Sequence, residues 1–328
     1  MKALVYTGTQ ALEVRNVSEA EPLAGQCIVD ISHCGICGSD MHAYHGHDAR
    51  RVPPLVLGHE AVGIVRSGRF GGQRVAINPL MACGHCALCL SAREHLCAER
   101  ELIGMRVPGA FAQSVAISEG NIYPLPDDLA FEQAALAEPL ACAVHAVSIA
   151  LKQTTSLSKE AKVVVLGGGA IGLLCALVFG LRGMKNLHVA ETNPLRRQTL
   201  EQAIDGQIYD PLTTVQQEGH ADIVLDAVGS GITRNAASQL VAPGGVIVHI
   251  GLQDSNDGLD TRRLTLQEIT FVGTYCYTNN DFAEALKLLH SGQIKGDGWS
   301  ELRELEGGAQ AFMDIHNGTA LPKIILSI

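Results

Sequence analysis

The chain has 328 residues, of which 47% are hydrophobic and 18% are charged, so it is long enough for two domains with a sizeable buried core. Its formal net charge is -10, and its lysines and arginines are scattered rather than clustered. These features argue against nucleic acid or an anionic membrane as a partner and favour a small-molecule substrate.

The N-terminal segment carries no recognisable export signal, because Lys2 is followed by an apolar run that is too short for a secretory h-region. The longest apolar segments, such as 163–181, are interrupted by glycines, so we expect no membrane-spanning helix. Ten cysteines in such a chain favour metal binding over a disulfide framework. A cytoplasmic location is therefore expected.

Short apolar runs broken by glycine, proline and asparagine fill the first half of the chain, to about Val147. Examples are residues 27–31, 61–65 and 74–77. Such runs are typical of β strands separated by turns. The first half is therefore predicted to form a mostly β domain.

Two short motifs in this half contain metal-binding residue types: Cys34-Gly-Ile-Cys-Gly-Ser-Asp-Met-His42 and Gly58-His59-Glu60. Each is weak alone, because a Cys-x2-Cys pair can be a redox motif and a lone histidine is more often packed or hydrogen-bonded. Cys34 is expected to be a small buried residue.

Taken together, Cys37, His59, Glu60 and Glu138 of the segment Ala-Glu-Pro-Leu supply sulfur, nitrogen and oxygen ligands. That mixture is typical of a catalytic zinc with one position left for water or substrate. A zinc in this setting acts as a Lewis acid that lowers the pKa of a bound alcohol.

Four further cysteines, Cys83, Cys86, Cys89 and Cys97, have the spacing C-x2-C-x2-C-x7-C. Four thiolates close a tetrahedral zinc and leave no open position, so this site should be structural. The alternatives are reduced thiols without a metal, or His85 in place of one cysteine.

Strands and helices alternate after residue 161, which is typical of βαβ units and a parallel sheet. Apolar runs predict strands at 163–166, 188–190, 223–225 and 246–250. Apolar spacing predicts helices at 171–181, 194–203, 232–240 and 280–289, with a turn at 241–245. The closing run at 323–328 is expected to return to the first domain.

A glycine-rich turn follows the first of these strands and opens a helix, with G-x-G-x-x-G at Gly167, Gly169 and Gly172. In that context the motif indicates a dinucleotide whose phosphates lie at the helix N-terminus. Glu191 ends the next apolar run, where an acid binds ribose hydroxyls and repels a 2′-phosphate. NAD is therefore favoured, although Arg196 and Arg197 leave NADP open.

In this order the segments GICGSDMH and GHE, the four-cysteine lobe, EPL and the glycine-rich turn resemble the zinc-dependent medium-chain alcohol dehydrogenase family, most closely its polyol (sorbitol-type) branch. The resemblance covers nearly the whole chain. It implies a GroES-like catalytic domain of residues 1–147 and 277–328, and a Rossmann-type, doubly wound coenzyme domain of residues 148–276. It also implies an α/β fold, two zinc ions per chain, and a homo-dimer or homo-tetramer.

By the resemblance Cys37 and His59 would be ligands of the catalytic zinc, and Glu60 and Glu138 would be direct or alternating further ligands. Asp40 would orient the His59 ring.

The same resemblance implies that Ser39 accepts the alcohol proton and passes it through the cofactor ribose toward His42. A solvated loop histidine is the alternative for His42, because His45 and His47 lie nearby in the chain.

Position in the family also suggests which residues contact the dinucleotide. Arg196 would lie along the adenosine, and two segments would line the nicotinamide, although plain strand-end packing explains them equally well. The cofactor residues implied are Gly167, Gly169, Ile171, Gly172, Glu191, Arg196, Ile250, Gly251, Leu252, Thr274, Tyr275 and Cys276.

Two departures from the family pattern matter. The segment 65–75 is shorter than usual and lacks Gly-Asp-Arg-Val, which trims a surface turn. Cys276 stands where sorbitol-type enzymes carry arginine, and losing that donor puts a sugar polyol in doubt.

The leading hypothesis is a dehydrogenase of a secondary alcohol or polyol that also reduces the matching ketone. A threonine-like amino alcohol or a phosphorylated polyol is the alternative substrate. A non-catalytic dinucleotide-binding relative and a zinc-free quinone reductase are disfavoured, because Cys37, Ser39, His59 and Glu138 are all present.

Overall fold

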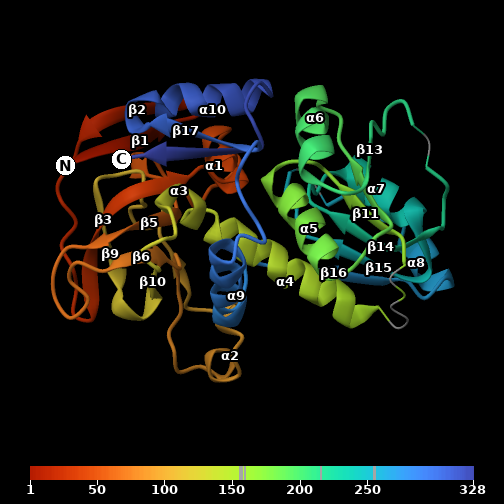
Figure 1. The fold of residues 1–328 in the computed structure, drawn as a ribbon, viewed down its shortest axis with the longest axis horizontal. Coiled ribbons are helices and arrows are strands. Elements are labelled where there is room, and N and C mark those ends of the chain that lie inside the picture. Colours follow the sequence, from red (N-terminus) through yellow and green to blue (C-terminus); the bar gives the residue numbers. More distant parts are fainter. Residues whose placement is uncertain (155–157, 159, 215, 254–255) are drawn as a thin grey trace. The chain divides into compact units, whose positions relative to one another are not determined.

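The computed structural model describes residues 1–154, 158, 160–214, 216–253 and 256–328. These residues divide into two compact units, one of residues 1–141 with 277–328 and the other of residues 142–276 (Figure 1). The division falls within helix α4 (Ala137–Gln153), the helix that also contains the boundary expected at residue 147.

Three sheets make up most of the first unit, as the prediction of a mostly β domain requires. The first contains β2 (Ala11–Asn16), β1 (Lys2–Gly8) and β4 (Leu55–Val56) in this order. The second has the order β10 (Ile122–Pro124), β6 (Arg74–Ile77), β5 (Glu60–Val65), β3 (Gln26–Gly35), β18 (Lys323–Ser327) and β17 (Ser300–Glu304), with β9 (Ser114–Ser118) also paired to β3. The third pairs β7 (Leu80–Met81) with β8 (Glu101–Leu102).

Helices and 3-10 turns connect these strands. They are α1 (Gly38–Tyr44), α2 (Ala87–Leu90), η1 (Glu94–Leu96), η2 (Glu119–Asn121), α3 (Phe131–Ala134), α9 (Asn279–His290), η3 (Leu305–Gly307) and α10 (Gly308–Asn317). The predicted helix 280–289 is confirmed in α9, where Thr278 provides the N-cap. The closing run returns as predicted, because β18 pairs antiparallel with β3.

The register of β3 brings the metal-binding motifs of the sequence together. Gly35 lies opposite Ile325 of β18 on one side and opposite Glu60 of β5 on the other. Cys37 follows the end of β3, and His59 immediately precedes β5. Neighbouring antiparallel strands therefore place one motif against the other.

The second unit is built on a parallel six-stranded sheet. Its order is β13 (Gln207–Tyr209), β12 (Leu187–Ala190), β11 (Val163–Leu166), β14 (Ala221–Asp226), β15 (Val241–His249) and β16 (Thr270–Gly273). This is the 3-2-1-4-5-6 order of dinucleotide-binding folds, which confirms the predicted Rossmann-type sheet.

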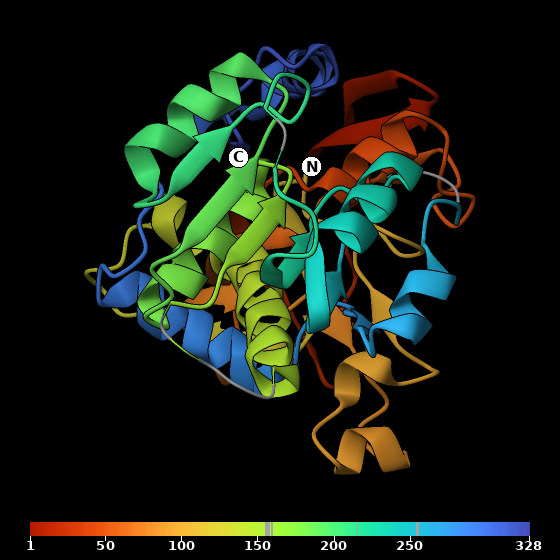
Figure 2. The ribbon, with the colours of Figure 1, turned by 90° about the vertical axis from the view of Figure 1, so that its right-hand side faces the viewer.

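Helices lie on both sides of that sheet, since Figure 2 shows α6 (Pro194–Ala203) on one side and α7 (Gly231–Leu240) on the other. The predicted helix 194–203 is confirmed at both ends, with Pro194 in the first turn and Asn193 as N-cap. α5 (Ala170–Leu181) and α8 (Thr261–Leu266) complete the set.

The predicted turn at 241–245 lies inside β15 rather than before it. The pairing with β14 jumps from Ala221 opposite Val241 to Ile223 opposite Val246, and Gly244 has a φ of 72°. The chain therefore bulges out and rejoins the same strand, a form that the Pro-Gly-Gly sequence alone cannot distinguish from a turn.

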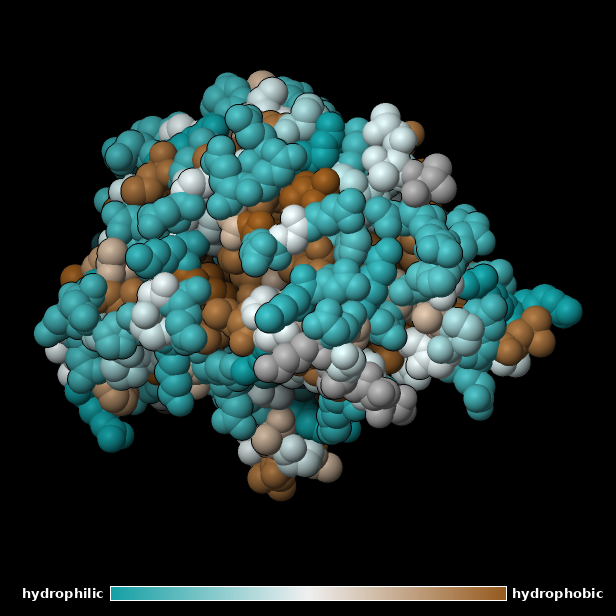
Figure 3. Space-filling view, turned by 45° about the vertical axis from the view of Figure 1, so that its right-hand side comes forward, coloured by the Kyte–Doolittle hydropathy of each residue, from teal (hydrophilic) through white to brown (hydrophobic). Residues whose placement is uncertain are grey.

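The expectation that no apolar segment is long enough to span a membrane was wrong in one detail. Among the described residues one helical stretch, Phe131–Gln153, has the length and composition, but 72% of its apolar window is buried inside the protein. That burial is typical of a core helix. The face drawn in Figure 3 is mostly hydrophilic.

Candidate metal centres and dinucleotide site

Cys37 is held at the N-terminus of α1 by local hydrogen bonds. It is the N-cap of the helix, its backbone N–H donates to Asp40 Oδ2 at 3.0 Å, and its Sγ accepts from the Ser39 N–H at 3.4 Å. These bonds fix the position of the Cys37 sulfur at the start of α1.

The His59 ring lies between two residues of α1. Its Nδ1 is 3.5 Å from Asp40 Oδ1, and its Nε2 is 3.4 Å from Ser39 Oγ. Burial acts to lower the pKa of His59, but the negative charges of Asp40 and Cys37 outweigh it and raise that pKa well above its ordinary value. Asp40 thus lies on the Nδ1 side of the ring and Ser39 on its Nε2 side.

Glu60 is fully buried and needs both a space and a counter-charge. The space comes from Gly35, since a Cβ there would lie 2.0 Å from Glu60 Oε2. The counter-charge is the buried Lys323, whose Nζ forms an ion pair with Glu60 Oε2 and donates to the Ile36 carbonyl at 2.9 Å. Lys323 thus balances a charge that would otherwise be costly to bury.

Glu138 lies beside this group, in the first turn of α4, and accepts a hydrogen bond from the Tyr277 hydroxyl at 3.1 Å. Burial raises the pKa of Glu138 to about 7, with the His59 charge opposing the rise and the Glu60 charge adding to it. Among the described residues Glu138 is not one of those whose ligand atoms lie within 4.8 Å of one another, a group that contains Cys37, His59 and Glu60.

Three of the candidate ligands fit a metal ion directly. Ligand atoms of Cys37, His59 and Glu60 lie within 4.8 Å of one another, with the last two side chains buried. Within the part of the chain that the structure describes, Glu60 Oε1 has no hydrogen-bond partner although it is buried. A zinc ion would satisfy that oxygen, and sulfur, imidazole and carboxylate are ligands that zinc accepts.

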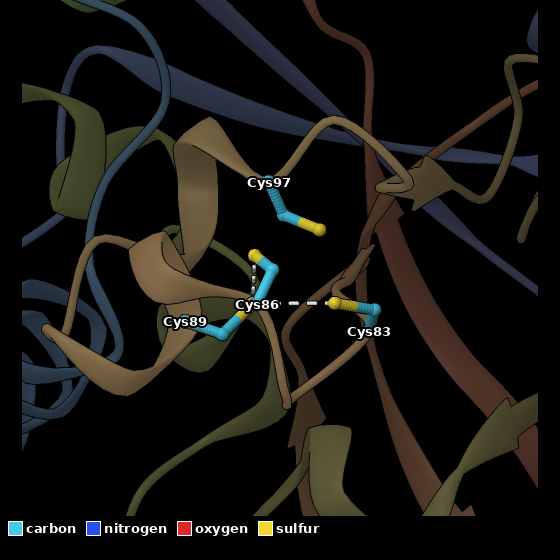
Figure 4. Close-up of side chains that lie close together, drawn as sticks. All are labelled: Cys83, Cys86, Cys89 and Cys97. Carbon is cyan, nitrogen blue, oxygen red and sulfur yellow. Dashed lines mark hydrogen bonds between the residues drawn. The ribbon is translucent and has the colours of Figure 1, made fainter.

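The four-cysteine cluster predicted from the spacing is confirmed. Figure 4 shows Cys83, Cys86, Cys89 and Cys97 turned toward a common centre, and their sulfur atoms all lie within 4.8 Å of one another. Cys89 Sγ is 3.5 Å from Cys86 Sγ and 3.8 Å from Cys83 Sγ. This geometry suits a closed tetrahedral zinc.

The four cysteines form their cluster without His85, although the ligand atom of His85 lies within 4.8 Å of those of Cys83 and Glu99. The His85 ring is exposed, and Nδ1 lies 2.9 Å from the carbonyl oxygen of Cys83. Cys34 is fully buried on β3, as expected, and burial is the main cause that raises the pKa of its thiol well above the ordinary value.

The glycine-rich turn between β11 and α5 has the geometry that its motif predicts. Gly167 has a φ of 96°, a conformation that favours glycine. Gly169 is the N-cap of α5, and Ile171 lies in the first turn. A Cβ on Gly172 would lie 1.8 Å from the Gly167 carbonyl oxygen, so this glycine allows the close packing of helix and strand.

Glu191 follows β12 and is buried against this turn. Its carboxylate accepts from the Gly168 N–H and from the Asn193 N–H, both at 2.7 Å. Arg197 donates to the Glu191 and Thr192 carbonyls at 2.9 and 2.7 Å and pairs with Asp210 at 3.1 Å. The guanidinium of Arg197 is therefore already engaged.

Arg196 differs from its neighbour. Its Nη1 lies 4.0 Å from the position of a Cβ on Gly169, and among the described residues its Nε is buried without a hydrogen-bond partner. This arginine is therefore the one directed at the glycine-rich turn.

Two further predicted segments follow strands of the same sheet. Ile250, Gly251 and Leu252 come after β15, and Thr274, Tyr275 and Cys276 come after β16. In a parallel sheet these strand ends share the carboxyl edge with the ends of β11 and β12. Thr274 Oγ1 is buried there without a partner within the described ranges, an arrangement that a ligand would satisfy.

Three residues at the metal centre were missed by the sequence reasoning: Arg51, Tyr277 and Lys323. Each is buried. Arg51 lies in the chain between the two motifs, whereas Tyr277 and Lys323 reach the site from the C-terminal part of the chain. No local pattern marks them. The available signal was a charged residue within or beside an apolar run, as at Lys323.

Comparison with known proteins agrees with this geometry. Residues 23–127 match the alcohol dehydrogenase GroES-like domain, and residues 170–291 match the zinc-binding dehydrogenase family. The chain is 32% identical over 308 residues to 2-dehydro-3-deoxy-L-galactonate 5-dehydrogenase of Pseudoalteromonas atlantica, covering 90% of this chain and 89% of that protein.

Solved structures share the fold over the whole chain. An alcohol dehydrogenase from Escherichia coli CFT073, complexed with NADH, has a TM-score of 0.89 at 23% identity, covering 100% of this chain and 99% of that one. A protein from Sinorhizobium meliloti 1021, described as a zinc-binding dehydrogenase and bound to NADP, has a TM-score of 0.87 at 25% identity with the same coverage.

Proposed function

Because the chain belongs to the zinc-binding medium-chain alcohol dehydrogenase family, we propose that it passes hydride between a secondary alcohol or polyol and NAD, reversibly. Membership makes it a zinc-containing dehydrogenase that acts on the CH–OH group of alcohols or polyols. The observation that carries the finer proposal is the set of Cys37, His59 and Glu60 beside Ser39.

Bound zinc would supply Lewis acidity that lowers the pKa of the alcohol hydroxyl, and bound NAD would accept the hydride. In this proposal Cys37 and His59 hold the zinc, and Glu60 and Glu138 are alternating further ligands. Lys323 pairs with Glu60 Oε2, which leaves Oε1 as the Glu60 oxygen that would contact the zinc. Asp40 keeps the His59 ring oriented.

Ser39 would receive the proton of the alcohol. Its hydroxyl lies next to Nε2 of His59, the ring atom on the ligand side, and a hydroxyl can accept one proton while it gives up another. His42 is half-buried on the same helix and would take the proton after the cofactor ribose.

NAD is the proposed dinucleotide, with NADP the weaker alternative. Glu191 brings a buried negative charge to the end of β12, where it would meet the adenosine ribose and repel a 2′-phosphate. Arg197 is engaged with Asp210 and two carbonyls, so only Arg196 remains directed at the turn.

Replacing Glu191 by alanine should lower the preference for NAD over NADP, measured as the ratio of kcat/KM values, by about tenfold or more. The variant loses both the ribose partner and the charge that repels the phosphate. Glu201→Gln is the matched control, because it removes an exposed carboxylate from α6 in the same unit. An unchanged ratio in Glu191→Ala would contradict the assignment of this residue.

The proposed function is tested by metal analysis together with a panel of substrates. Secondary alcohols, polyols, a sugar acid, threonine and a phosphorylated polyol are assayed with NAD and with NADP. We expect two zinc ions per chain and reduction of NAD with a secondary alcohol or polyol. One zinc that leaves only on unfolding, with no turnover of any compound, would favour a non-catalytic relative instead.

No disulfide joins any cysteine in the part of the chain that the structure describes, which suits a reducing compartment and supports the proposed cytoplasmic location. A homo-dimer or homo-tetramer remains the expectation for its assembly.

A further inference from the structure

Arg51 is a buried cation beside the metal centre that no motif of the sequence identifies. It follows α1 and the histidine-containing loop, and its side chain is 0% exposed. A guanidinium is costly to bury unless each of its donors finds an acceptor. Its contacts therefore show what this arginine does.

Two of these contacts fix the plane of the guanidinium. Nη1 donates to Asp48 Oδ2 at 2.6 Å, and Nε donates to the Gly104 carbonyl at 2.9 Å. Because the guanidinium is rigid and planar, these two bonds also decide where Nη2 points. It donates to Ser39 Oγ at 3.1 Å and lies 3.9 Å from Asp40 Oδ1.

The third contact constrains the Ser39 hydroxyl. That oxygen has two lone pairs and one hydrogen, and Arg51 occupies one lone pair. The hydroxyl hydrogen must therefore point away from Arg51, and one lone pair remains for a proton from another group. A free serine hydroxyl rotates among several orientations, whereas this one is restricted.

We propose that Arg51 is a positioning residue, which holds the Ser39 hydroxyl oriented for proton exchange with the alcohol. The inference rests on the proposed function, because it gives Ser39 the role of proton acceptor. Positioning of this kind raises the rate of the chemical step without adding a contact to the substrate.

The surroundings of Arg51 support this role. Burial lowers the pKa of His42, and the Arg51 charge lowers it further. Arg50 also pairs with Asp48, at 2.8 Å, but its side chain is 49% exposed. The chain thus offers a neighbouring arginine with the same acidic partner as a control.

A purely structural role is the competing explanation, since Arg51 also ties its loop to Gly104. A double-mutant cycle separates the two, because a residue that acts through Ser39 has no effect once Ser39 is absent. The set is Arg51→Gln, Arg51→Lys, Ser39→Ala, Ser39→Thr and the Ser39 variants combined with Arg51→Gln, with Arg50→Gln as the control.

The assay uses the zinc-loaded enzyme, NAD and the best alcohol of the panel. We expect Arg51→Gln to lower kcat about tenfold, with a change of less than about twofold in KM and full zinc content. Arg51→Gln should have no further effect in Ser39→Ala, and its effect should return in Ser39→Thr, which restores a hydroxyl. If the glutamine variant does not fold, Arg51→Lys takes its place in the cycle. It keeps the charge but lacks the planar fork, so the same dependence of the kcat loss on the Ser39 hydroxyl is expected.

An equal loss of kcat from Arg51→Gln with and without the Ser39 hydroxyl would overturn the proposal. Arg51 would then have a purely structural role. A loss confined to KM, or the same loss in Arg50→Gln, would also overturn it. Absence of turnover by the unchanged enzyme across the panel would instead contradict the proposed function, and this inference with it.

Discussion

Replacement of His59 by alanine is expected to lower kcat/KM for the alcohol by about 1,000-fold or more and to remove one of two zinc ions per chain. In the proposed metal centre the ring supplies the ligand nitrogen, and Asp40 Oδ1, 3.5 Å from Nδ1, would lose its partner. The fold should persist, because His59 precedes β5 rather than lying within it and the second cluster is untouched.

Zinc content, steady-state rates and the far-ultraviolet circular dichroism spectrum check this result. His47→Ala is the matched control, since it removes an exposed histidine from the loop that follows α1. A variant at His59 that retained both zinc ions and full activity would remove this residue from the metal centre.

Replacement of Cys89 by serine should affect folding rather than the chemical step. The Cys89 sulfur is within 3.8 Å of both Cys83 and Cys86, so its loss opens the four-sulfur shell. Structural zinc contributes of the order of 10 kcal/mol to folding in small zinc domains, so we expect a large fall in soluble yield and in Tm.

Cys142→Ser provides the control for Cys89, because Cys142 is also half-buried but lies on α4, outside the cluster. Zinc content and thermal unfolding are measured for both variants. A Cys89 variant with an unchanged Tm and a selectively reduced kcat would show that the cluster is not a structural site.

Local patterns in the sequence predicted much of the parallel sheet and its helices. The strand at β11 and the helix α6 were predicted to the residue, since an apolar run and a Pro after an Asn N-cap are local signals. Short pairs such as β7 with β8 carry no such signal, because pairing partners supply the stability.

The candidate site residues also fall into those that local motifs identify and those that they do not. Cys37, His59 and the four-cysteine cluster were found because their motifs are contiguous in the chain. Lys323 and Tyr277 could not be found, because only the return of the C-terminal segment brings them to Glu60 and Glu138. Their roles depend on long-range packing that no local pattern records.

Gly35 and Gly38, near the start of α1, differ in whether evolution can replace them by a larger residue. A side chain at Gly35 would collide with the Glu60 carboxylate, whereas a Cβ at Gly38 would meet no atom within 4 Å. A substitution of Gly38 therefore takes no space from the metal centre. A side chain with a new functional group can appear there, at the N-terminus of α1. Position 35 is closed to such a substitution for as long as an acid occupies position 60.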